Sequence, residues 1–473
     1  MEYKESCLCL NRSGLKRVKA DGEIASVSTD SCYTEEFIER LNAHNFQGVS
    51  DYSNEVFLYY YVRMREFTEL LKNNECFRFS FFAQLVDKSL FIRASSELGR
   101  NIRTSSRLLV DALSFFAFVC SVVAIPSLSL VLPCFLVRKK TRGSRLQLDP
   151  DREAVFLIRS DAAFRKCRVS IERSISAVTL VDNFGGLDVP GLSMYTVISR
   201  KNFLKISLKS FAYTIRDIRN FLEDGRVMLG DSCSYALISR YVSRIAHKAV
   251  YEACLLEVIR LSPRAVFYTG DKDDRFALLQ TRLCRCEKKK LVCLPHGLEY
   301  GFRFPGGLAG TTFYCYTPEA SSFLNKLYNE DKFVYEASVA DAMFGEIKFL
   351  KQIERACFFT EPRDPEVNYQ TIEELIQRGV NFVIKLHPLE TASDYKHRFP
   401  NVDQIEDLDE AMRSSVCIAR KSTILLEASR RGAKAIASLV NDKDRSYVMR
   451  IFPSLCSMNI LRASTFDELE KLL

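Results

Sequence analysis

Three segments of the chain place basic and hydroxyl side chains where short apolar runs end. One of them, NFVIKLHPLE, begins at Asn381 and runs from apolar residues into Lys385 and His387, after which Pro388 stops the strand. Alternate residues of a strand point to the same face, so Lys385 and His387 share one side of it. An ammonium group and an imidazole placed together in this way are suited to binding a phosphate group.

A second segment, SVCIARKSTILLEASRRG, predicts a strand that ends at Arg420 and a helix that Gly432 stops. Ser422 or Thr423 occupies the N-cap of that helix, where free N–H groups form a site for an anion. Glu427, one turn inside the helix, is placed to accept hydrogen bonds from a ribose diol. Together with the preceding segment, these residues predict a nucleotide-sized pocket.

Two further strand ends carry side chains that could take part in chemistry. LVCLPHGLEYG ends a strand at His296 and Gly297 and carries Glu299 two residues later, and AVFYTGD ends at Asp271. The acidic pair before Gly225 is instead interpreted as the end of a helix with its capping glycine.

The elements that position these side chains are strands alternating with helices, in two series at residues 150–316 and 351–473. Such alternation is typical of parallel sheets built from βαβ units. The predicted fold class is therefore α/β, with two doubly wound, Rossmann-like domains that face a cleft and are joined by a linker at 317–350. Ligands of such sheets bind at the carboxyl ends of the strands, which is where the candidate residues lie.

Two further features precede these series. Residues 1–105 are predicted to be a mostly helical extension, and residues 106–145 contain a thirty-residue apolar run whose only charge is Asp111. The run is longer than one membrane span needs and is interrupted by Pro126 and Pro133, so we expect a hairpin that dips into one leaflet; a spanning helix and a buried core hairpin are the alternatives. Basic residues lie on both sides of it: Arg103, Arg107, Arg138, Lys139, Lys140 and Arg142.

Composition narrows the class of protein. The 473 residues carry a net charge of +8 without a basic stripe, which favours anionic partners such as phosphate groups or acidic lipid over nucleic acid. The sixteen cysteines include no CxxC pair and the N-terminus has no secretory signal, so free thiols in a reducing compartment are expected. The sequence has no GxGxxG and no acidic pair suited to a metal-bound diphosphate, so neither a cofactor nor a metal ion is expected.

The segments LPHG, KLHPLE and ARKSTILLEA, in this order, resemble the HG, HP and Ser/Thr motifs of the GT-B glycosyltransferases that build bacterial capsules and lipopolysaccharides. This group contains sialyltransferases, polysialyltransferases and Kdo transferases, and the CDP-glycerol polyol-phosphate transferases are related to it. The resemblance extends over residues 153–440. It implies inverting, metal-independent transfer of sialic acid or Kdo from a CMP-sugar to a glycan or glycolipid acceptor. With the apolar segment, it implies a peripheral or monotopic protein on the cytoplasmic face of the bacterial inner membrane.

The resemblance also implies roles for single residues. His387, Ser422 and Thr423 would hold the nucleotide phosphate with support from Lys385. His296 would be the base that activates the acceptor hydroxyl, with Gly297 beside the substrate. If a carboxylate is the base instead, Asp271 is preferred and Glu299 is second. The chain departs from many sialyltransferases, which carry an acidic pair where it has a proline and His296, and this makes it more similar to the polyol-phosphate enzymes. Transfer of glycerol or ribitol phosphate from a CDP-linked donor is therefore the nearest alternative function, and a non-catalytic, membrane-docked scaffold is the other.

Overall fold

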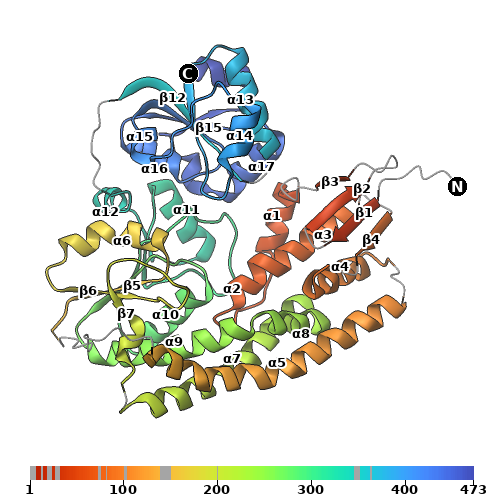
Figure 1. The fold of residues 1–473 in the computed structure, drawn as a ribbon, viewed down its shortest axis with the longest axis vertical. Coiled ribbons are helices and arrows are strands. Elements are labelled where there is room, and N and C mark those ends of the chain that lie inside the picture. Colours follow the sequence, from red (N-terminus) through yellow and green to blue (C-terminus); the bar gives the residue numbers. More distant parts are fainter. Residues whose placement is uncertain are drawn as a thin grey trace. The chain divides into compact units, whose positions relative to one another are not determined.

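The computed structural model divides the chain into two compact units (Figure 1). The first consists of Met1–Cys32, Ala43–Leu294 and Phe304–Phe313, and the second of Tyr33–Asn42, Pro295–Arg303 and Tyr314–Leu473. This corrects the expected boundaries, because most of the N-terminal extension belongs to the first unit and is no separate domain. The residues that the structure describes are 7–11, 14–18, 24–26, 32–72, 76–80, 83–100, 104–138, 151–199, 201–345, 352–362 and 365–473.

A parallel sheet forms the centre of the first unit. Its strands lie in the order β10-β9-β8-β5-β6-β7, and each of these pairings is parallel. The strands expected at AVFYTGD and LVCLPHG are confirmed as β8 and β9, and AVFLI and AVTLV form β5 and β6. Their apolar side chains are largely buried, as expected inside a parallel sheet. The bounds are β5 (Ala154–Ile158), β6 (Ala177–Val181), β7 (Leu192–Ser193), β8 (Val266–Thr269), β9 (Leu291–Cys293) and β10 (Thr312–Tyr314).

The helices of the first unit include one that is longer than predicted. α7 continues past Gly225, so the interpretation of this glycine as a helix cap is wrong. A Cβ at this position would come within 2.7 Å of the Ser234 hydroxyl oxygen, so Gly225 allows α7 and α8 to pack closely. The neighbouring Asp224 accepts hydrogen bonds from the backbone N–H groups of Val49 (2.9 Å) and Ser50 (3.0 Å). The bounds are α6 (Asp161–Arg173), α7 (Phe203–Leu229), α8 (Asp231–Arg240), α9 (Val242–Leu261) and α10 (Arg275–Cys286).

Among the described residues of 1–105, helical residues outnumber strand residues, as expected. The N-terminal part also contains a four-stranded sheet that was not predicted, in the order β3-β2-β1-β4, in which β1 pairs antiparallel with β2 and parallel with β4. α2, η2 and α3 follow one another directly, so this stretch is helical with a π-helical middle. The bounds are β1 (Cys7–Asn11), β2 (Gly14–Val18), β3 (Ile24–Ser26), α2 (Ser53–Val56), η2 (Phe57–Tyr61), α3 (Val62–Lys72), β4 (Cys76–Phe79) and α4 (Leu85–Glu97).

The apolar segment is one continuous helix, α5 (Thr104–Arg138), so the predicted hairpin is wrong. Pro126 and Pro133 lie inside the helix, and nearby serine hydroxyls donate to backbone carbonyl groups around the first of them, Ser127 to Val123 (2.9 Å) and Ser129 to Pro126 (2.8 Å). By length and composition, Ser106–Leu136 could cross a membrane: a window within it has a mean hydropathy of 2.4, and 22% of that window is buried. The basic residues that follow α5 lie outside the described residues: Lys139, Lys140 and Arg142.

The second unit is built on a parallel sheet in the order β13-β12-β14-β15-β16. The strands expected at NFVIKLHP and SVCIAR are confirmed as β13 and β14. Residues 317–345, expected in a linker, form two helices and a strand and belong to this unit, which corrects that expectation. The strands of this sheet are β12 (Ile353–Phe359), β13 (Phe382–Lys385), β14 (Ser414–Ala419), β15 (Lys434–Ser438) and β16 (Leu461–Ala463); β11 (Phe333–Val334) is not part of it.

The helices of the second unit begin with α1, which comes from the N-terminal part of the chain. The helix predicted from TILLEASRRG is α16, and Gly432 follows it with a φ of +83°, as expected of a glycine that ends a helix. The bounds are α1 (Glu35–Asn42), α11 (Pro318–Tyr328), α12 (Ala337–Ala342), α13 (Pro365–Gln377), α14 (Ala392–Arg398), α15 (Leu408–Ala411), α16 (Ile424–Arg430), α17 (Asp442–Ile451) and α18 (Phe466–Leu472).

Both units therefore have the predicted α/β architecture. A GT-B-like fold consists of two such units in one chain. Free thiols were expected, and the described cysteines with an assigned state are all free thiols. Most are buried, and burial raises the pKa of Cys417, for example, to about 12, so these thiols are unreactive.

Candidate functional site

The turn after β13 holds His387 in a defined orientation. Its backbone N–H donates to the Thr360 hydroxyl oxygen (3.0 Å) and to Oε2 of Glu390 (3.1 Å), and Pro388 is exposed at the tip of the turn. Nδ1 of His387 accepts a hydrogen bond from the backbone N–H of Leu389 (3.2 Å), so a neutral imidazole carries its proton on Nε2. The Nε2–H is thereby set as a donor, which is what a phosphate oxygen requires.

Glu390 is the residue that fixes this turn. Its carboxylate accepts hydrogen bonds from the hydroxyls of Thr360 and Tyr395 and from the side-chain amide of Asn368 (3.2 Å). These partners come from the end of β12 and from helices α14 and α13, so three elements are joined to one carboxylate. Lys385, the last residue of β13, is half-buried, and its Nζ donates to the next backbone carbonyl (3.2 Å).

Several residues after β14 form ion pairs or hydrogen bonds with other groups of the protein. Arg420 is buried in an ion pair with Asp444, with Nη2 and Oδ1 3.0 Å apart. Ser422 accepts a hydrogen bond from the backbone N–H two residues later (3.3 Å), and Thr423 precedes α16 without a capping bond from its side chain. Glu427 forms an ion pair with the arginine four residues later (2.6 Å). Its predicted contact with a ribose would have to share the carboxylate with that arginine.

The two predicted phosphate-binding segments lie at the same edge of one sheet. β12 lies between β13 and β14, and since neighbouring strands are about 4.8 Å apart, the backbones of the two segments are separated by roughly 10 Å. A nucleotide lying across the end of β12 would meet Lys385 and His387 on one side and Ser422 and Thr423 on the other. The convergence of all four residues on a single phosphate stays a prediction.

The HG motif lies in a segment that belongs to the second unit, whereas a place in the first was expected. Gly297 has a φ of +79°, a conformation that favours glycine. Glu299 is buried and accepts a hydrogen bond from the backbone N–H of Ser454, so its carboxylate is already engaged. His296 is half-buried. Whether His296 or Glu299 acts as a base stays a prediction.

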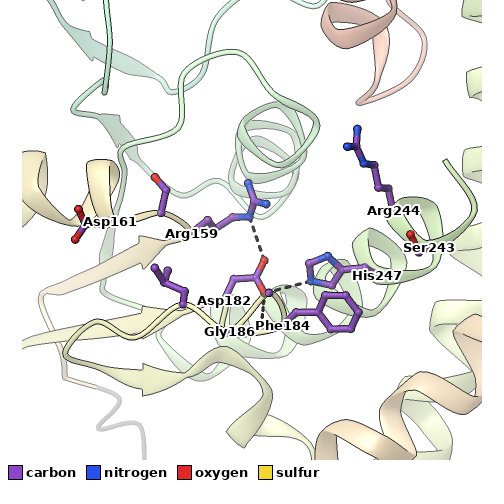
Figure 2. A pocket seen from close by; sticks show the side chains of 11 residues that line it. Arg159, Asp161, Asp182, Phe184, Gly186, Ser243, Arg244 and His247 are labelled. Carbon is purple, nitrogen blue, oxygen red and sulfur yellow. Dashed lines mark hydrogen bonds and ion pairs between the residues drawn. The ribbon is translucent and has the colours of Figure 1, made fainter. Parts of the chain in front are cut away.

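The first unit contains a cluster at the carboxyl ends of β5 and β6 that was not singled out in the sequence. Asp182 directly follows β6, and its carboxylate accepts from Nε of Arg159 (3.2 Å), which follows β5, and from the hydroxyl of Tyr195 (2.7 Å). Burial alone would raise the pKa of Asp182, but hydrogen bonds from His247 and Tyr195 and the charge of Arg159 hold this pKa well below its usual range. Figure 2 shows Asp182 between Arg159 and His247.

His247, from α9, completes this cluster. Its Nε2 lies 2.7 Å from the Tyr195 hydroxyl oxygen and 3.2 Å from Oδ1 of Asp182, and its ring stacks on Phe184 with centroids 4.1 Å apart. Because the Tyr195 hydroxyl donates its proton to Asp182, Nε2 of a neutral imidazole is the protonated nitrogen and Nδ1 is the basic one. Nδ1 points away from Asp182 (Figure 2) and has no hydrogen-bond partner in the part of the chain that the structure describes. An imidazole held in this way by a carboxylate is the arrangement of a general base.

Arg159, Asp182 and His247 line a cavity of about 540 Å³ in the first unit, a size that is typical of small-molecule sites. The loop after β6, including Phe184, and two residues of α9, Ser243 and Arg244, form other parts of its wall. Arg244 is exposed, stacks on Tyr241 (5.1 Å to the ring centroid) and forms no ion pair with any described residue. The cavity therefore offers a base, an aromatic face and an uncompensated cation.

Asp271, the predicted carboxylate base, lies beside this cluster and is held in an ion pair. It is buried, and its Oδ2 is 3.2 Å from Nη1 of Arg159, which also contacts Asp274 (2.7 Å). Burial opposes the charge of Arg159, yet the carboxylates of Asp274, Asp271 and Asp182 raise its pKa above the usual value. Asp271 thus helps to position Arg159 beneath the cavity, and its role as a base stays a prediction.

A group of three buried carboxylates elsewhere in the first unit has the spacing of a metal site: Asp51, Asp217 and Glu252. Nζ of Lys248 lies 2.7 Å from Asp51, 2.8 Å from Asp217 and 3.5 Å from Glu252. An ammonium group therefore occupies the position that a metal ion would take. The cluster is an ion network that joins the N-terminal segment to α7 and α9.

No protein-family model matches the chain, and no curated protein matches its sequence. Among solved structures, the UDP-GlcNAc 2-epimerase of Neisseria meningitidis bound to UDP-GlcNAc is similar with a TM-score of 0.38 and 9% identity, covering 67% of this chain and 89% of its own. UDP-N-acetylglucosamine 2-epimerase of Rickettsia bellii gives 0.39 and 12%, covering 68% and 86%. The MnaA–UDP complex of S. aureus gives 0.34 and 11%, covering 60% and 78%. Because these TM-scores lie below 0.5, the inferences that follow rest on the residues of this chain.

Proposed function

We propose that the chain is a sugar-nucleotide-utilising transferase in which the second unit binds the nucleotide and His247 of the first unit removes the proton of an acceptor hydroxyl. The observation that carries the proposal is the pairing of His247 with Asp182 in a cavity at the carboxyl edge of a parallel sheet. His247 takes the place that the sequence had suggested for His296, because its basic nitrogen faces open space and its other nitrogen is held by a carboxylate.

The donor that fits best is a CMP-linked acidic sugar, as the resemblance of the HG, HP and Ser/Thr motifs implies. CMP leaves with a single phosphate, whose charge the Lys385 ammonium and the Nε2–H of His387 would stabilise without a metal ion. Ser422 and Thr423 would bind its other oxygens. For the acceptor, a glycan with a free hydroxyl and an anionic group suits the first-unit cavity, since Arg244 supplies a cation there.

Turnover and nucleotide binding test the two roles separately. His247→Gln keeps a side-chain N–H toward Asp182 and removes the basic nitrogen, so kcat should fall by about 10²–10⁴ while CMP affinity, measured by calorimetry, stays unchanged. His387→Ala should lower CMP affinity. His397→Ala, which alters an exposed histidine of α14, is the matched control and should change neither quantity. Loss of CMP binding in His247→Gln, or full turnover in it, would contradict this division of roles.

A donor panel tests the reaction class. CMP-sialate, CMP-Kdo, CDP-glycerol, CDP-ribitol and UDP-N-acetylglucosamine are each incubated with the protein and a set of glycan acceptors, and donor consumption and product are followed by mass spectrometry. Turnover of a CMP-sugar supports the proposal. Turnover of a CDP-alcohol selects the polyol-phosphate alternative, epimerisation of the UDP-sugar overturns the assignment as a transferase, and binding of no nucleotide selects the scaffold.

A further inference from the structure

The solvent-facing surface of α5 is more apolar than its buried face. The buried face combines four aliphatic side chains with three serines, each of which donates its hydroxyl hydrogen to a backbone carbonyl of the same helix at 2.7 to 2.8 Å: Val110, Ile125, Leu132 and Leu136, and Ser114, Ser121 and Ser129. The exposed face carries large apolar side chains, among them Leu109, Leu113, Phe116, Val123, Val131 and Phe135. A surface helix of a water-soluble protein instead turns its apolar stripe inward and a polar face outward. The outward face of α5 is therefore built for a solvent or partner less polar than water.

This apolar face is long. From Leu109 to Phe135 it extends over roughly 40 Å of helix, and Phe116 and Val123 near its middle are 67% and 68% exposed. α7, which packs against α5, adds Leu204 and Leu208, exposed by 67% and 57%. Contiguous apolar surfaces larger than a few hundred Å² are rare on soluble monomers and mark interaction sites.

Basic residues beside this face favour an anionic bilayer as its partner. Arg107, at the start of α5, is 59% exposed, and Lys201 is exposed just before α7. Four more basic residues end or follow α5 in the sequence, whereas Asp111 is the one acidic residue within the helix. Membrane-surface helices combine these features, because apolar side chains enter the acyl region while cations meet anionic headgroups.

The packing of α5 favours an orientation in the membrane plane over a span. The 35 residues of α5 extend over about 52 Å, whereas the hydrocarbon core of a bilayer is about 30 Å thick. The inner face of α5 packs against α4, α7, α8 and α9. α7 exposes charged side chains such as Arg219 and Glu223. If α5 crossed the bilayer, α7 would enter the hydrocarbon with it, and these charges would lose their hydration.

We propose that the outer face of α5, with Leu204 and Leu208 of α7, is a monotopic membrane-binding surface that lies in the plane of an anionic bilayer and enters one leaflet without crossing it. This proposal is independent of the transferase proposal, because it involves neither the nucleotide-binding turn nor His247. It specifies which side of the first unit meets the lipid, which the sequence alone did not.

The absence of tryptophan from the sequence provides a clean test, because a single introduced indole reports only on its own site. Phe116→Trp lies at the middle of the exposed face, and Ile175→Trp, at a fully exposed position away from α5, is the matched control. The full chain is mixed with phosphatidylcholine vesicles containing phosphatidylglycerol and brominated acyl chains. Phe116→Trp should show a blue shift and several-fold quenching, and Ile175→Trp neither; omission of phosphatidylglycerol should weaken the quenching.

A series along the helix distinguishes the orientations. Leu109→Trp, Phe116→Trp, Val123→Trp and Val131→Trp should all be quenched best by bromines near the headgroups, because every position lies at a similar shallow depth. Deep quenching in the middle of the series with shallow quenching at its ends would show a spanning helix and overturn the proposal. Equal fluorescence of Phe116→Trp and Ile175→Trp with vesicles, or a dimer that already shields the indole at position 116 without lipid, would overturn it as well.

Discussion

The hydroxyl of Tyr195 lies 2.7 Å from Oδ1 of Asp182 and 2.7 Å from Nε2 of His247, and so bridges the carboxylate and the imidazole of the first-unit cavity. Burial and the neighbouring Asp182 raise the pKa of Tyr195 well above its usual value, so the hydroxyl stays protonated. It donates its proton to Asp182, and its oxygen accepts from Nε2–H of His247. This bridge determines which imidazole nitrogen is basic, and Tyr195 is therefore a positioning residue.

Replacement of this hydroxyl should weaken the base without removing it. Tyr195→Phe deletes both hydrogen bonds of the bridge. The bond that orients the imidazole is worth roughly 1 kcal/mol, so kcat should fall about fivefold with little change in KM. A purely structural tyrosine would instead lower the melting temperature and leave kcat of the folded protein unchanged. Tyr235→Phe, which alters a tyrosine of α8 outside the cavity, is the control. An unchanged kcat in Tyr195→Phe would contradict the bridging role.

The buried network around Lys248 should dominate the stability of the first unit. Lys248 has no exposed surface and contacts three carboxylates, so Lys248→Met would leave Asp51, Asp217 and Glu252 buried with too little positive charge. Removal of one partner from a buried ion network typically costs about 3–5 kcal/mol. Urea unfolding should show this loss in Lys248→Met and a change below about 1 kcal/mol in Lys205→Met, whose side chain is half exposed. Equal midpoints for the two variants would show that the network does not stabilise the fold.

Because of Asp51, the stabilisation that the Lys248 network provides should depend on pH. Burial alone would raise the pKa of Asp51, but Lys248 and Arg282 lower it far below its usual value of about 3.9. A carboxyl group with a lowered pKa in the folded state contributes its full stabilisation above its unfolded pKa and loses it as the pH falls toward the folded value. The unmodified protein should thus lose stability below about pH 4. Asp51→Asn should be less stable at pH 7 and lose less over the acid range; parallel thermal-unfolding curves from pH 7 to pH 3 would contradict this assignment.

The α/β architecture could be predicted because strands such as β5 and β14 are compact apolar runs followed by polar turns, and helices such as α7 are clearly amphipathic. The prediction failed where local preference is overridden. The prolines of α5 indicated a break, but the helix continues through Pro126 and Pro133, and serine hydroxyls bind neighbouring carbonyl groups. The strands of the N-terminal sheet are three to five residues long, too short to give a clear alternation of polar and apolar positions.

The first-unit cluster was missed for a different reason. Asp182 directly follows the apolar strand β6, but its partners Tyr195 and His247 lie 13 and 65 residues further along the chain. His247 belongs to α9, which is buried on nearly all sides, so no polar face marks it in the sequence. The remaining signal was the rarity of histidine, and this pointed equally to His296 and His387. Only the packing of α9 against the end of β6 identifies His247 as the partner of a carboxylate.

Glu390 should control nucleotide affinity without touching the nucleotide. Its carboxylate accepts from the backbone N–H of His387 and fixes the turn that orients the imidazole. Glu390→Ala should therefore weaken CMP binding about tenfold although His387 is present, whereas Glu390→Gln, which keeps an acceptor oxygen, should lose less. Calorimetry measures both, and Glu366→Ala, at an exposed position on α13, is the control. Unchanged affinity in Glu390→Ala, with its fold intact by circular dichroism, would show that the turn needs no such support.

A substitution of Glu299 tests whether the carboxylate of the HG segment is catalytic or structural. The buried carboxylate accepts a hydrogen bond from the backbone N–H of Ser454. It therefore joins the HG segment to the start of the 3₁₀ helix at Pro453–Cys456. Glu299→Gln retains an acceptor oxygen and should keep kcat within about twofold while lowering the melting temperature by a few degrees, as expected when one charged hydrogen bond becomes neutral. A loss of kcat of about 10² or more in Glu299→Gln, with His247→Gln remaining active, would assign the base to Glu299 and move the acceptor site away from the first-unit cavity. The two variants measured side by side therefore distinguish a base in the HG segment from a base on α9.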